Sequence, residues 1–306
     1  MGTPQFALPS FEAIADSEEV IAVVTQPDRP AGRGMALTAS PIKNAALKRN
    51  IPIYQPERIR KDTAFIKTLS DLHPDMIIVV AFGQILPESV LTIPRLGCIN
   101  LHASLLPKYR GAAPIQWALI RGEKTTGVAS MQMDAGMDTG AILLQQEVVI
   151  DAGEMATALS TRLSHSGVNV LVETIKKIKE GSLVPTPQPA EGVTLAPLLK
   201  KEDGYIRWGD SATQIFNRYQ GVFAWPETTM FHGEERLKII ALKIGSQEGR
   251  WGAPGELLKV SDQGLEIAAG IGYIVITRLK FSGGKDIAAE CYAANVGLPI
   301  GTIFHT

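Results

Sequence analysis

The stretch Cys98-Ile-Asn-Leu-His-Ala-Ser-Leu-Leu-Pro-Lys-Tyr-Arg-Gly-Ala-Ala-Pro114 begins as an apolar strand and becomes polar where that strand ends. Asn100 and His102 alternate with apolar residues, so both are expected to point to one side of the strand. Polar side chains at such a point are typical of the edge where open α/β sheets bind ligands. On spacing alone, His102 fits a hydrogen-bonded structural histidine as well as a catalytic one.

Apolar runs and helical patterns alternate through the first half of the chain. The runs have the composition of strands buried on both faces of a parallel sheet, and they span residues 20–25, 76–81 and 98–101. One helix between them has a clear start, because Ser40 is a favourable N-cap and Pro41 a favourable first residue, and it is expected to reach residue 50. The alternation predicts an α/β fold with a Rossmann-like open, mostly parallel sheet.

Two strands at residues 127–133 and 141–149 are expected next, around a glycine-rich turn, followed by a long helix over residues 154–179 that Gly181 ends. The start of the chain is unusual. Gly2-Thr-Pro4 has the composition of a loop after a first strand, yet only Met1 precedes it. The sequence therefore predicts that a central strand is missing, as a truncation or a late start codon would leave it.

A proline-rich segment divides the chain. Its prolines disfavour regular structure, so we predict a catalytic domain over residues 1–181, a linker over 182–201 and a second domain over 202–306. In the second domain, Asp210 is expected to cap a short helix. Glycine turns then separate short strands at residues 237–244, 255–260, 265–269 and 273–281. This pattern predicts a small, oligonucleotide-binding-like β-barrel.

The charge of the whole chain is close to balanced, with 30 basic and 31 acidic side chains. A nucleic-acid partner must therefore be held by a local basic patch rather than by a global field. Residues 29–61 contain eight basic side chains and a single acid, Glu57. Within this segment, Arg29 and Arg33 lie in a loop punctuated by proline and glycine, which suits ordering around a polyanion.

Cysteine usage and hydropathy indicate the compartment. Cys98 and Cys291 are too few for a disulfide framework or a cysteine-rich metal site. No apolar run approaches the roughly eighteen residues that a membrane helix needs, and the start of the chain is acidic rather than signal-like. We expect a cytoplasmic protein.

The turn Met133-Asp-Ala-Gly-Met-Asp-Thr-Gly140 offers a carboxylate near the strand ends. Asp134 and Asp138 are both candidates. Aspartates in such a turn often bond only their own backbone, so the residues alone do not decide between a structural and a functional role.

Four motifs, in order and spacing, resemble the signature of folate-dependent formyltransferases: Asn100-Leu-His102, Ser104-Leu-Leu-Pro107, Arg110-Gly-Ala-Ala-Pro114 and Asp138-Thr-Gly140. Two more segments and the C-terminal region are similar to those members of the family that act on aminoacyl-tRNA. These segments are Gly2-Thr-Pro-Gln-Phe-Ala7 and Gln26-Pro-Asp-Arg-Pro-Ala-Gly-Arg-Gly34. The resemblance covers nearly the whole chain.

The resemblance implies transfer of a formyl group from 10-formyltetrahydrofolate to the α-amino group of methionyl initiator tRNA, a step of translation initiation. It implies that Asn100, His102 and Asp138 form the catalytic trio, in preference to Asp134. Asn100 and a protonated His102 would donate to the formyl oxygen of a tetrahedral intermediate, and Asp138 would favour the imidazolium and relay the amine proton. No metal is required, and a monomer is expected.

The resemblance also implies the binding residues. The folate pocket is expected to be lined by Ser104, Leu105, Leu106 and Pro107, with a second wall from Phe82, Gly83, Ile85 and Leu86. Contacts with tRNA are expected from Arg29, Arg33, Lys43, Lys200 and Lys201. For Lys200 and Lys201, at the end of the predicted linker, a role as solvated surface charges is equally plausible.

Other functions fit the sequence less well. A formyltransferase for a small amine, such as glycinamide ribonucleotide or an amino-sugar nucleotide, would need neither the Arg29 loop nor a second domain. A nicotinamide-dependent oxidoreductase is disfavoured because no G-x-G-x-x-G motif follows a strand. A catalytically silent folate- or RNA-binding module is disfavoured by the intact trio.

Overall fold

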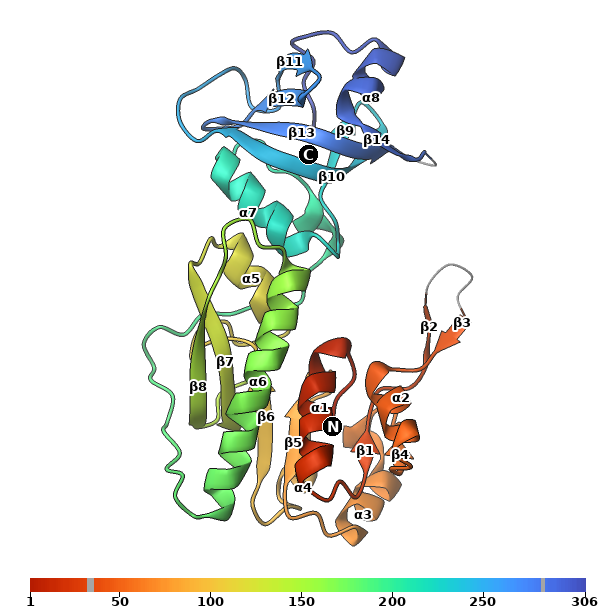
Figure 1. Cartoon of the computed structure of the whole chain (residues 1–306), viewed down its shortest axis with the longest axis vertical. Helices are drawn as coiled ribbons and strands as arrows, with labels where there is room; N and C mark the ends of the chain where they lie inside the picture. Colours follow the sequence, from red (N-terminus) through yellow and green to blue (C-terminus); the bar gives the residue numbers. More distant parts are fainter. Residues whose placement is uncertain (32–35, 282–283) are drawn as a thin grey trace. The chain divides into compact units, whose positions relative to one another are not determined.

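A computed structural model describes residues 1–31, 36–281 and 284–306 (Figure 1). The chain divides into two compact units. The first comprises Met1–Pro114, Thr125–Ile150 and Ala158–Pro197, and the second comprises Ile115–Lys124, Asp151–Thr157 and Leu198–Thr306. Two short segments of the predicted catalytic domain thus pack with the C-terminal residues. None of the described helices is long and apolar enough to cross a membrane.

The first unit is built on short strands, as the apolar runs predicted. A four-stranded sheet has the order β5-β6-β7-β8, and a separate parallel pair is formed by β1 and β4. The strand bounds are β1 Val23–Val24, β4 Ile53–Tyr54, β5 Ile77–Val80, β6 Cys98–His102, β7 Thr125–Gln132 and β8 Ile142–Val149. The β1–β4 and β5–β6 pairs are parallel, whereas β6–β7 and β7–β8 are antiparallel. The α/β class is confirmed, with an antiparallel edge added by the β7–β8 hairpin.

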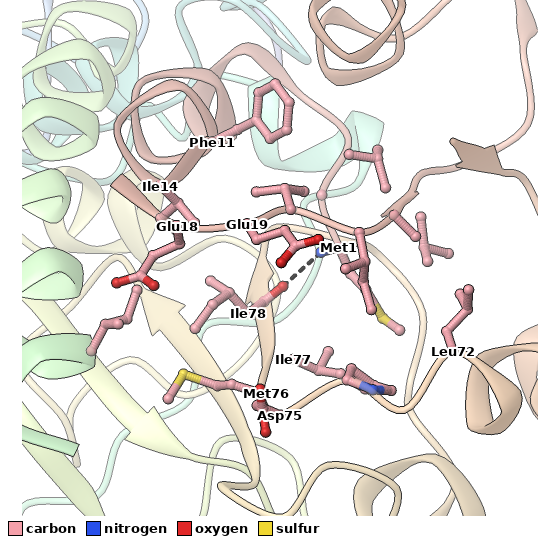
Figure 2. A pocket seen from close by; sticks show the side chains of 18 of the residues that line it. Met1, Phe11, Ile14, Glu18, Glu19, Leu72, Asp75, Met76, Ile77 and Ile78 are labelled. Atoms are coloured by element: carbon pink, nitrogen blue, oxygen red, sulfur yellow. Dashed lines mark hydrogen bonds between the residues drawn. The ribbon is translucent and has the colours of Figure 1, made fainter. Parts of the chain in front are cut away.

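The first two residues lie between β1 and β5. The amino group of Met1 donates to the carbonyl of Ile78, and the N–H of Gly2 donates to the carbonyl of Val24. Met1 lies in a cavity of about 570 Å³ that runs beside both strands. Phe11 and Ile14 also border this cavity (Figure 2). This cavity includes no residue of the predicted catalytic trio. It is therefore a feature separate from the candidate active site.

Helices cover both faces of the sheet (Figure 1). On one face α6 packs closely on β6, since a Cβ at Gly167 would fall 2.5 Å from the side chain of Leu101, and Thr174 is hydrogen-bonded to Ser130 of β7. On the other face, Phe65 and Val90 belong to one buried cluster with Ile77. The helix bounds are α1 Leu8–Ser17, α2 Pro41–Lys48, α3 Thr63–Asp71, α4 Glu88–Leu91 and α6 Ala156–Lys179, with 3-10 turns at Gln5–Ala7 and Ile59–Lys61.

Local sequence signals explain the helix ends. Ser40 caps α2 as predicted, because its Oγ accepts from the N–H of Lys43 at 3.0 Å. Gly181 follows α6 with a φ of +67°, a conformation that favours glycine. Between β1 and α2, the expected loop is a hairpin of β2 (Arg29–Ala31) and β3 (Ala36–Thr38), which projects from the body of this unit (Figure 1).

The second unit contains the predicted strands. Its antiparallel sheet has the order β11-β12-β13-β10-β9, with β14 paired to β13. The bounds are β9 Thr229–His232, β10 Glu235–Ser246, β11 Leu257–Ser261, β12 Gly264–Ala268, β13 Tyr273–Phe281 and β14 Asp286–Ala288. The helices are α5 Pro114–Ile120, α7 Ala212–Val222 and α8 Ala289–Val296, and a 3-10 turn lies at Lys201–Gly204.

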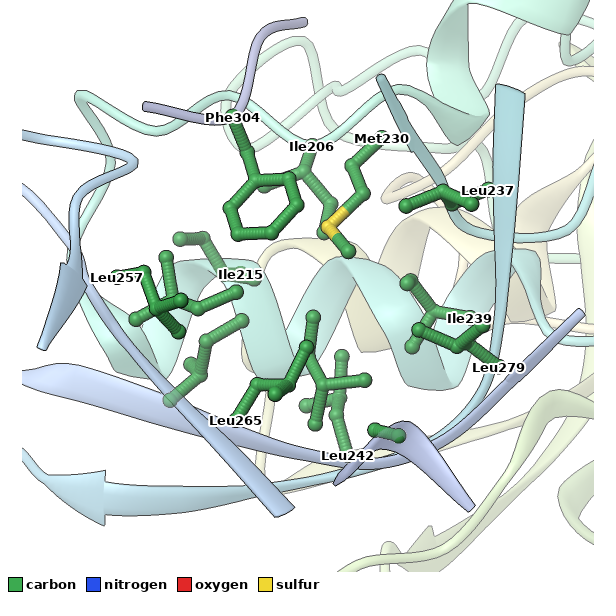
Figure 3. Packing of buried hydrophobic residues seen from close by; sticks show 14 of the residues in the cluster. Ile206, Ile215, Met230, Leu237, Ile239, Leu242, Leu257, Leu265, Leu279 and Phe304 are labelled. Atoms are coloured by element: carbon green, nitrogen blue, oxygen red, sulfur yellow. The ribbon is translucent and has the colours of Figure 1, made fainter. Parts of the chain in front are cut away.

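The C-terminal residues close this sheet into a barrel. Ile303 bridges to Glu256 beside β11, and His305 bridges to Phe231 of β9, so both edges of the sheet are paired. The buried cluster inside includes Ile215 of α7 and Phe304 (Figure 3).

One predicted cap in this unit is wrong. Ser211, rather than Asp210, caps α7, because Ser211 Oγ accepts from the N–H of Gln214 while the Gln214 side chain accepts from the N–H of Ser211. This reciprocal pair satisfies two backbone donors at once, so the helix starts one residue later than expected.

Candidate active site

Strand β6 presents Asn100 and His102 on one face, as the alternation predicted. Asn100 lies opposite Val79 of β5, and His102 lies opposite Ala129 of β7. The carboxamide of Asn100 is half-buried and has no hydrogen-bond partner among the described residues. It is therefore free to bind a ligand at the end of the strand.

The imidazole of His102 is buried and held on both sides. Its Nε2 lies 2.9 Å from the carbonyl oxygen of Tyr109, which can only accept, so this nitrogen carries a proton. Its Nδ1 lies 3.7 Å from Oδ2 of Asp138. Because Nε2 is hydrogen-bonded to the Tyr109 carbonyl, Nδ1 is the ring nitrogen that is available to a substrate.

The two loop aspartates have different surroundings. Asp134 is exposed and bonds its own loop, because its Oδ1 accepts from the N–H of Gly136 and from the hydroxyl of Thr139. Asp138 instead turns its carboxylate toward His102, and its Oδ2 accepts from the N–H of Gly111 at 2.8 Å. Asp134 thus has the structural role of bonding its own turn, and Asp138 is the carboxylate that lies beside the imidazole.

The turn after β6 contains four of the residues predicted to bind folate. Ser104 is buried and its hydroxyl donates to the carbonyl of Lys108 at 2.6 Å. Leu106 is buried, and its carbonyl accepts from Gln145. Leu105 and Pro107 are partly exposed. The side chains of Ser104 and Leu106 therefore hold the turn in shape, while the other two offer surface to a ligand.

The second predicted wall follows β5. Phe82 and Leu86 are buried in the core cluster with the strands, so they support the wall from within. Gly83 is exposed with a φ of +82°, and Ile85 is 59% exposed. Of these four residues, Ile85 and the backbone of Gly83 are the ones that can touch a ligand.

The predicted RNA contacts differ in their surroundings. Arg29 is exposed on β2, and Arg33 lies outside the described residues. Lys43 pairs with Asp28 at 2.6 Å, and Gln55 also donates to that carboxylate. These hydrogen bonds hold the pKa of Asp28 below its usual value of 3.8. The pair anchors the start of the β2–β3 hairpin.

The remaining predicted RNA contacts, Lys200 and Lys201, are exposed and belong to the second unit. Three His, Cys, Asp or Glu side chains arranged to hold a metal ion are not found in the described part of the chain.

Sequence reasoning missed a segment that contacts this site. Residues 186–196 fall in the predicted linker, yet Thr194 accepts from the backbone N–H groups of Tyr109 and Arg110, and Gln188 contacts the Asp138 loop. No periodicity or motif marks these residues, because the contacts join positions far apart in the chain.

The chain matches two family profiles. Residues 3–175 match the family described as "Formyl transferase", and residues 198–296 match "Formyl transferase, C-terminal domain". The first match alone covers more than half of the chain. The fold and the site thus belong to a formyl transferase.

The relatives define the branch of that family. The chain is 49% identical to the methionyl-tRNA formyltransferase of Thermodesulfovibrio yellowstonii over 94% of this chain and 92% of that protein. It is 46% identical to the methionyl-tRNA formyltransferase of Syntrophus aciditrophicus over 99% of this chain and 97% of that protein. The protein belongs to the methionyl-tRNA formyltransferase family.

Solved structures share the fold at lower identity. WlaRD, a sugar 3N-formyl transferase, aligns with a TM-score of 0.68 and 20% identity over 90% of this chain and 94% of that chain. An N-formyltransferase from Helicobacter canadensis aligns with a TM-score of 0.67 and 17% identity over 90% of this chain and 96% of that chain. These likenesses concern the fold alone.

Proposed function

We propose that the protein transfers the formyl group of 10-formyltetrahydrofolate to the α-amino group of methionyl initiator tRNA. The product is N-formylmethionyl-tRNA for translation initiation, made in the cytoplasm by a monomer. The observation that carries the proposal is the meeting of His102 and Asp138 beside a free Asn100 carboxamide. It occurs in a chain that is 49% identical to a methionyl-tRNA formyltransferase.

The reaction begins with attack of the neutral amine on the formyl carbon, which moves negative charge onto the formyl oxygen. Asn100 donates an N–H to that oxygen, and the Nδ1–H of a protonated His102 supplies a second donor. Each donor of this kind contributes roughly 3 to 4 kcal/mol of transition-state stabilisation. No metal ion is assigned a step.

Asp138 has two roles in this scheme. Its negative charge lies beside Nδ1 of His102, and it accepts the proton that leaves the attacking amine, directly or through a water. The N–H of Gly111 keeps the carboxylate oriented during the transfer. The C–N bond to the folate then breaks, and the folate nitrogen takes up a proton.

The substrates occupy the surfaces beside the trio. The folate lies along the turn of residues 104–107 and against Ile85, with Phe82, Gly83 and Leu86 forming and supporting the second wall. The tRNA is bound by Arg29 on the hairpin, by Arg33, and by Lys43 at the base of the hairpin. Lys200 and Lys201, at the end of a linker over residues 182–201, and the second domain after that linker add further contacts. Counterion release from these cations makes binding salt-dependent.

The experiment supplies the full chain with 10-formyltetrahydrofolate and methionyl initiator tRNA, then weighs the aminoacyl group released by mild base. A mass increase of one formyl group, absent when folate is omitted, is the expected result. Parallel reactions with glycinamide ribonucleotide and with an amino-sugar nucleotide test the nearest alternatives. Formylation of a small amine at a higher kcat/KM than that of the tRNA would overturn the proposal.

A further inference from the structure

Residues 186–196, after α6, form an extended strip along two loops of the site, the loop that contains Arg110 and the loop that contains Asp138. Thr186 exchanges two backbone hydrogen bonds of 2.8 Å with Ile142, at the start of β8. Further along, the N–H of Ala196 donates to the carbonyl of Arg110 at 2.7 Å. A Cβ at Gly111 would lie 2.6 Å from the carbonyl oxygen of Ala196, so the strip and this loop are in close contact. The strip therefore contacts both the segment that follows His102 and the segment that follows Asp138.

Gln188 is the side chain of this strip that reaches both loops. Its Nε2 donates to the carbonyls of Asp138 and Gly140, each at 2.8 Å. Its Oε1 accepts from Arg110, at 3.0 Å from Nε and 2.7 Å from Nη2. Because the guanidinium can only donate and the carbonyls can only accept, the orientation of the carboxamide is fixed.

The residue that Gln188 holds has an uncommon backbone conformation. Asp138 has a φ of +55°, a left-handed value that is disfavoured for residues with a Cβ. In that conformation its Oδ2 meets both the N–H of Gly111 and Nδ1 of His102. Gly111 directly follows Arg110. The carboxamide of Gln188 thus binds the backbone of Asp138 and also binds Arg110. Arg110 belongs to the loop whose Gly111 N–H binds the Asp138 carboxylate.

We propose that Gln188 is a positioning residue that fixes Asp138 against His102 for the transfer reaction. It does not touch substrate, and it acts only by holding the Asp138 turn. The inference rests on the proposed function for its kinetic consequence, whereas its structural consequence can be measured without any substrate.

Gln188→Glu removes the donor to Asp138 and Gly140 while it keeps the acceptor for Arg110. The carboxylate keeps the length of the side chain and its acceptor for Arg110, but it offers no donor and repels the carbonyls of Asp138 and Gly140. Gln146→Glu is the matched control, because it makes the same change at an exposed position of β8 whose side chain has no hydrogen-bond partner in the described chain. Gln188→Met removes the donor without adding charge, and it replaces the first variant if that variant does not fold.

Two measurements on the full chain test the inference. Under saturating substrates, kcat of Gln188→Glu is expected to fall about tenfold to a hundredfold, with both KM values changed less than threefold, since small displacements of reacting groups cost rates of this size. By NMR without substrate, hydrogen exchange at the Gly111 amide is expected to become at least tenfold faster, approaching that in Asp138→Ala. Gln146→Glu leaves both values unchanged.

Each outcome decides the question. Unchanged exchange at Gly111 in a folded Gln188→Glu or Gln188→Met protein overturns the inference, even where kcat falls. Faster exchange with kcat within twofold of the wild type overturns it also. If the wild type transfers no formyl group, the proposed function fails by itself, and the exchange measurement still decides whether Gln188 holds Asp138.

Discussion

Nδ1 of His102 lies 3.7 Å from Oδ2 of Asp138, and that same oxygen accepts the N–H of Gly111 at 2.8 Å. The imidazole comes from a strand and the carboxylate from a loop after the next strand. With Nε2 taken by the carbonyl of Tyr109, Nδ1 is the ring nitrogen of His102 that faces the carboxylate. In the proposed mechanism, this geometry places the charge of Asp138 beside the imidazole that donates to the formyl oxygen.

Removing the charge of Asp138 should therefore impair the chemical step. Asp138→Asn keeps the size of the side chain and an acceptor for Gly111, but it brings no negative charge to the imidazole and accepts no proton. We expect kcat to fall on the order of a hundredfold or more, within the range found for general acid–base groups. The matched control is Asp134→Asn, which changes the self-bonded aspartate of the same turn. Equal losses in the two variants would contradict the assigned role.

The donor role of Asn100 predicts an order among substitutions. Asn100→Ala removes one donor to the formyl oxygen and should lower kcat about a hundredfold to a thousandfold. Asn100→Asp should be slower still, because a carboxylate would face the developing negative charge. Steady-state rates at saturating folate and tRNA measure both, with Asn44→Ala on the exposed face of α2 as the control. An aspartate variant faster than the alanine variant would rule out oxyanion stabilisation by this residue.

The sequence predicted features that depend on neighbouring residues. Strand β6 and the cap at Ser40 follow from local composition, so both could be predicted. The choice between Asp134 and Asp138 could not be made from spacing, because both are turn aspartates and only the partner across space distinguishes them. Asp210 and Ser211 posed the same difficulty, since either side chain can cap a helix. Gln188 was missed because a contact made across some fifty residues of sequence leaves no local pattern.

The exposed position of Arg29 on β2 predicts a salt-dependent contact with tRNA. Arg29→Ala should raise the KM for tRNA, leave the KM for folate unchanged, and reduce the slope of log kcat/KM against log salt by about 0.7 to 0.9. Lys67→Ala removes a surface cation that pairs with Asp71 on α3 and should leave the slope unchanged. A loss of tRNA affinity that is independent of salt would show that Arg29 acts through structure instead.

The ion pair of Lys43 with Asp28 predicts how these two residues couple. If Lys43 mainly anchors the hairpin, Lys43→Met and Asp28→Asn should raise the KM for tRNA to a similar extent, and the double variant should be no worse than either. The two KM changes are measured beside melting temperatures for the same proteins. If Lys43→Met raises the KM further in the Asp28→Asn background, Lys43 contacts the RNA directly.

The two cysteines should differ sharply in reactivity. Cys98 begins β6 with only 1% of its surface exposed, and burial raises the pKa of its thiol to about 12, whereas Cys291 is exposed. Because the thiolate is the reactive form, raising the pH from 7 to 9 should leave Cys98 unmodified in the folded protein. An aromatic disulfide reagent should titrate one thiol in the native chain and two after denaturation, and Cys291→Ser should reduce the native value to none. Reaction of Cys98 in the native protein at a rate near that of Cys291 would show that the start of β6, and with it the strand carrying Asn100 and His102, opens readily to solvent.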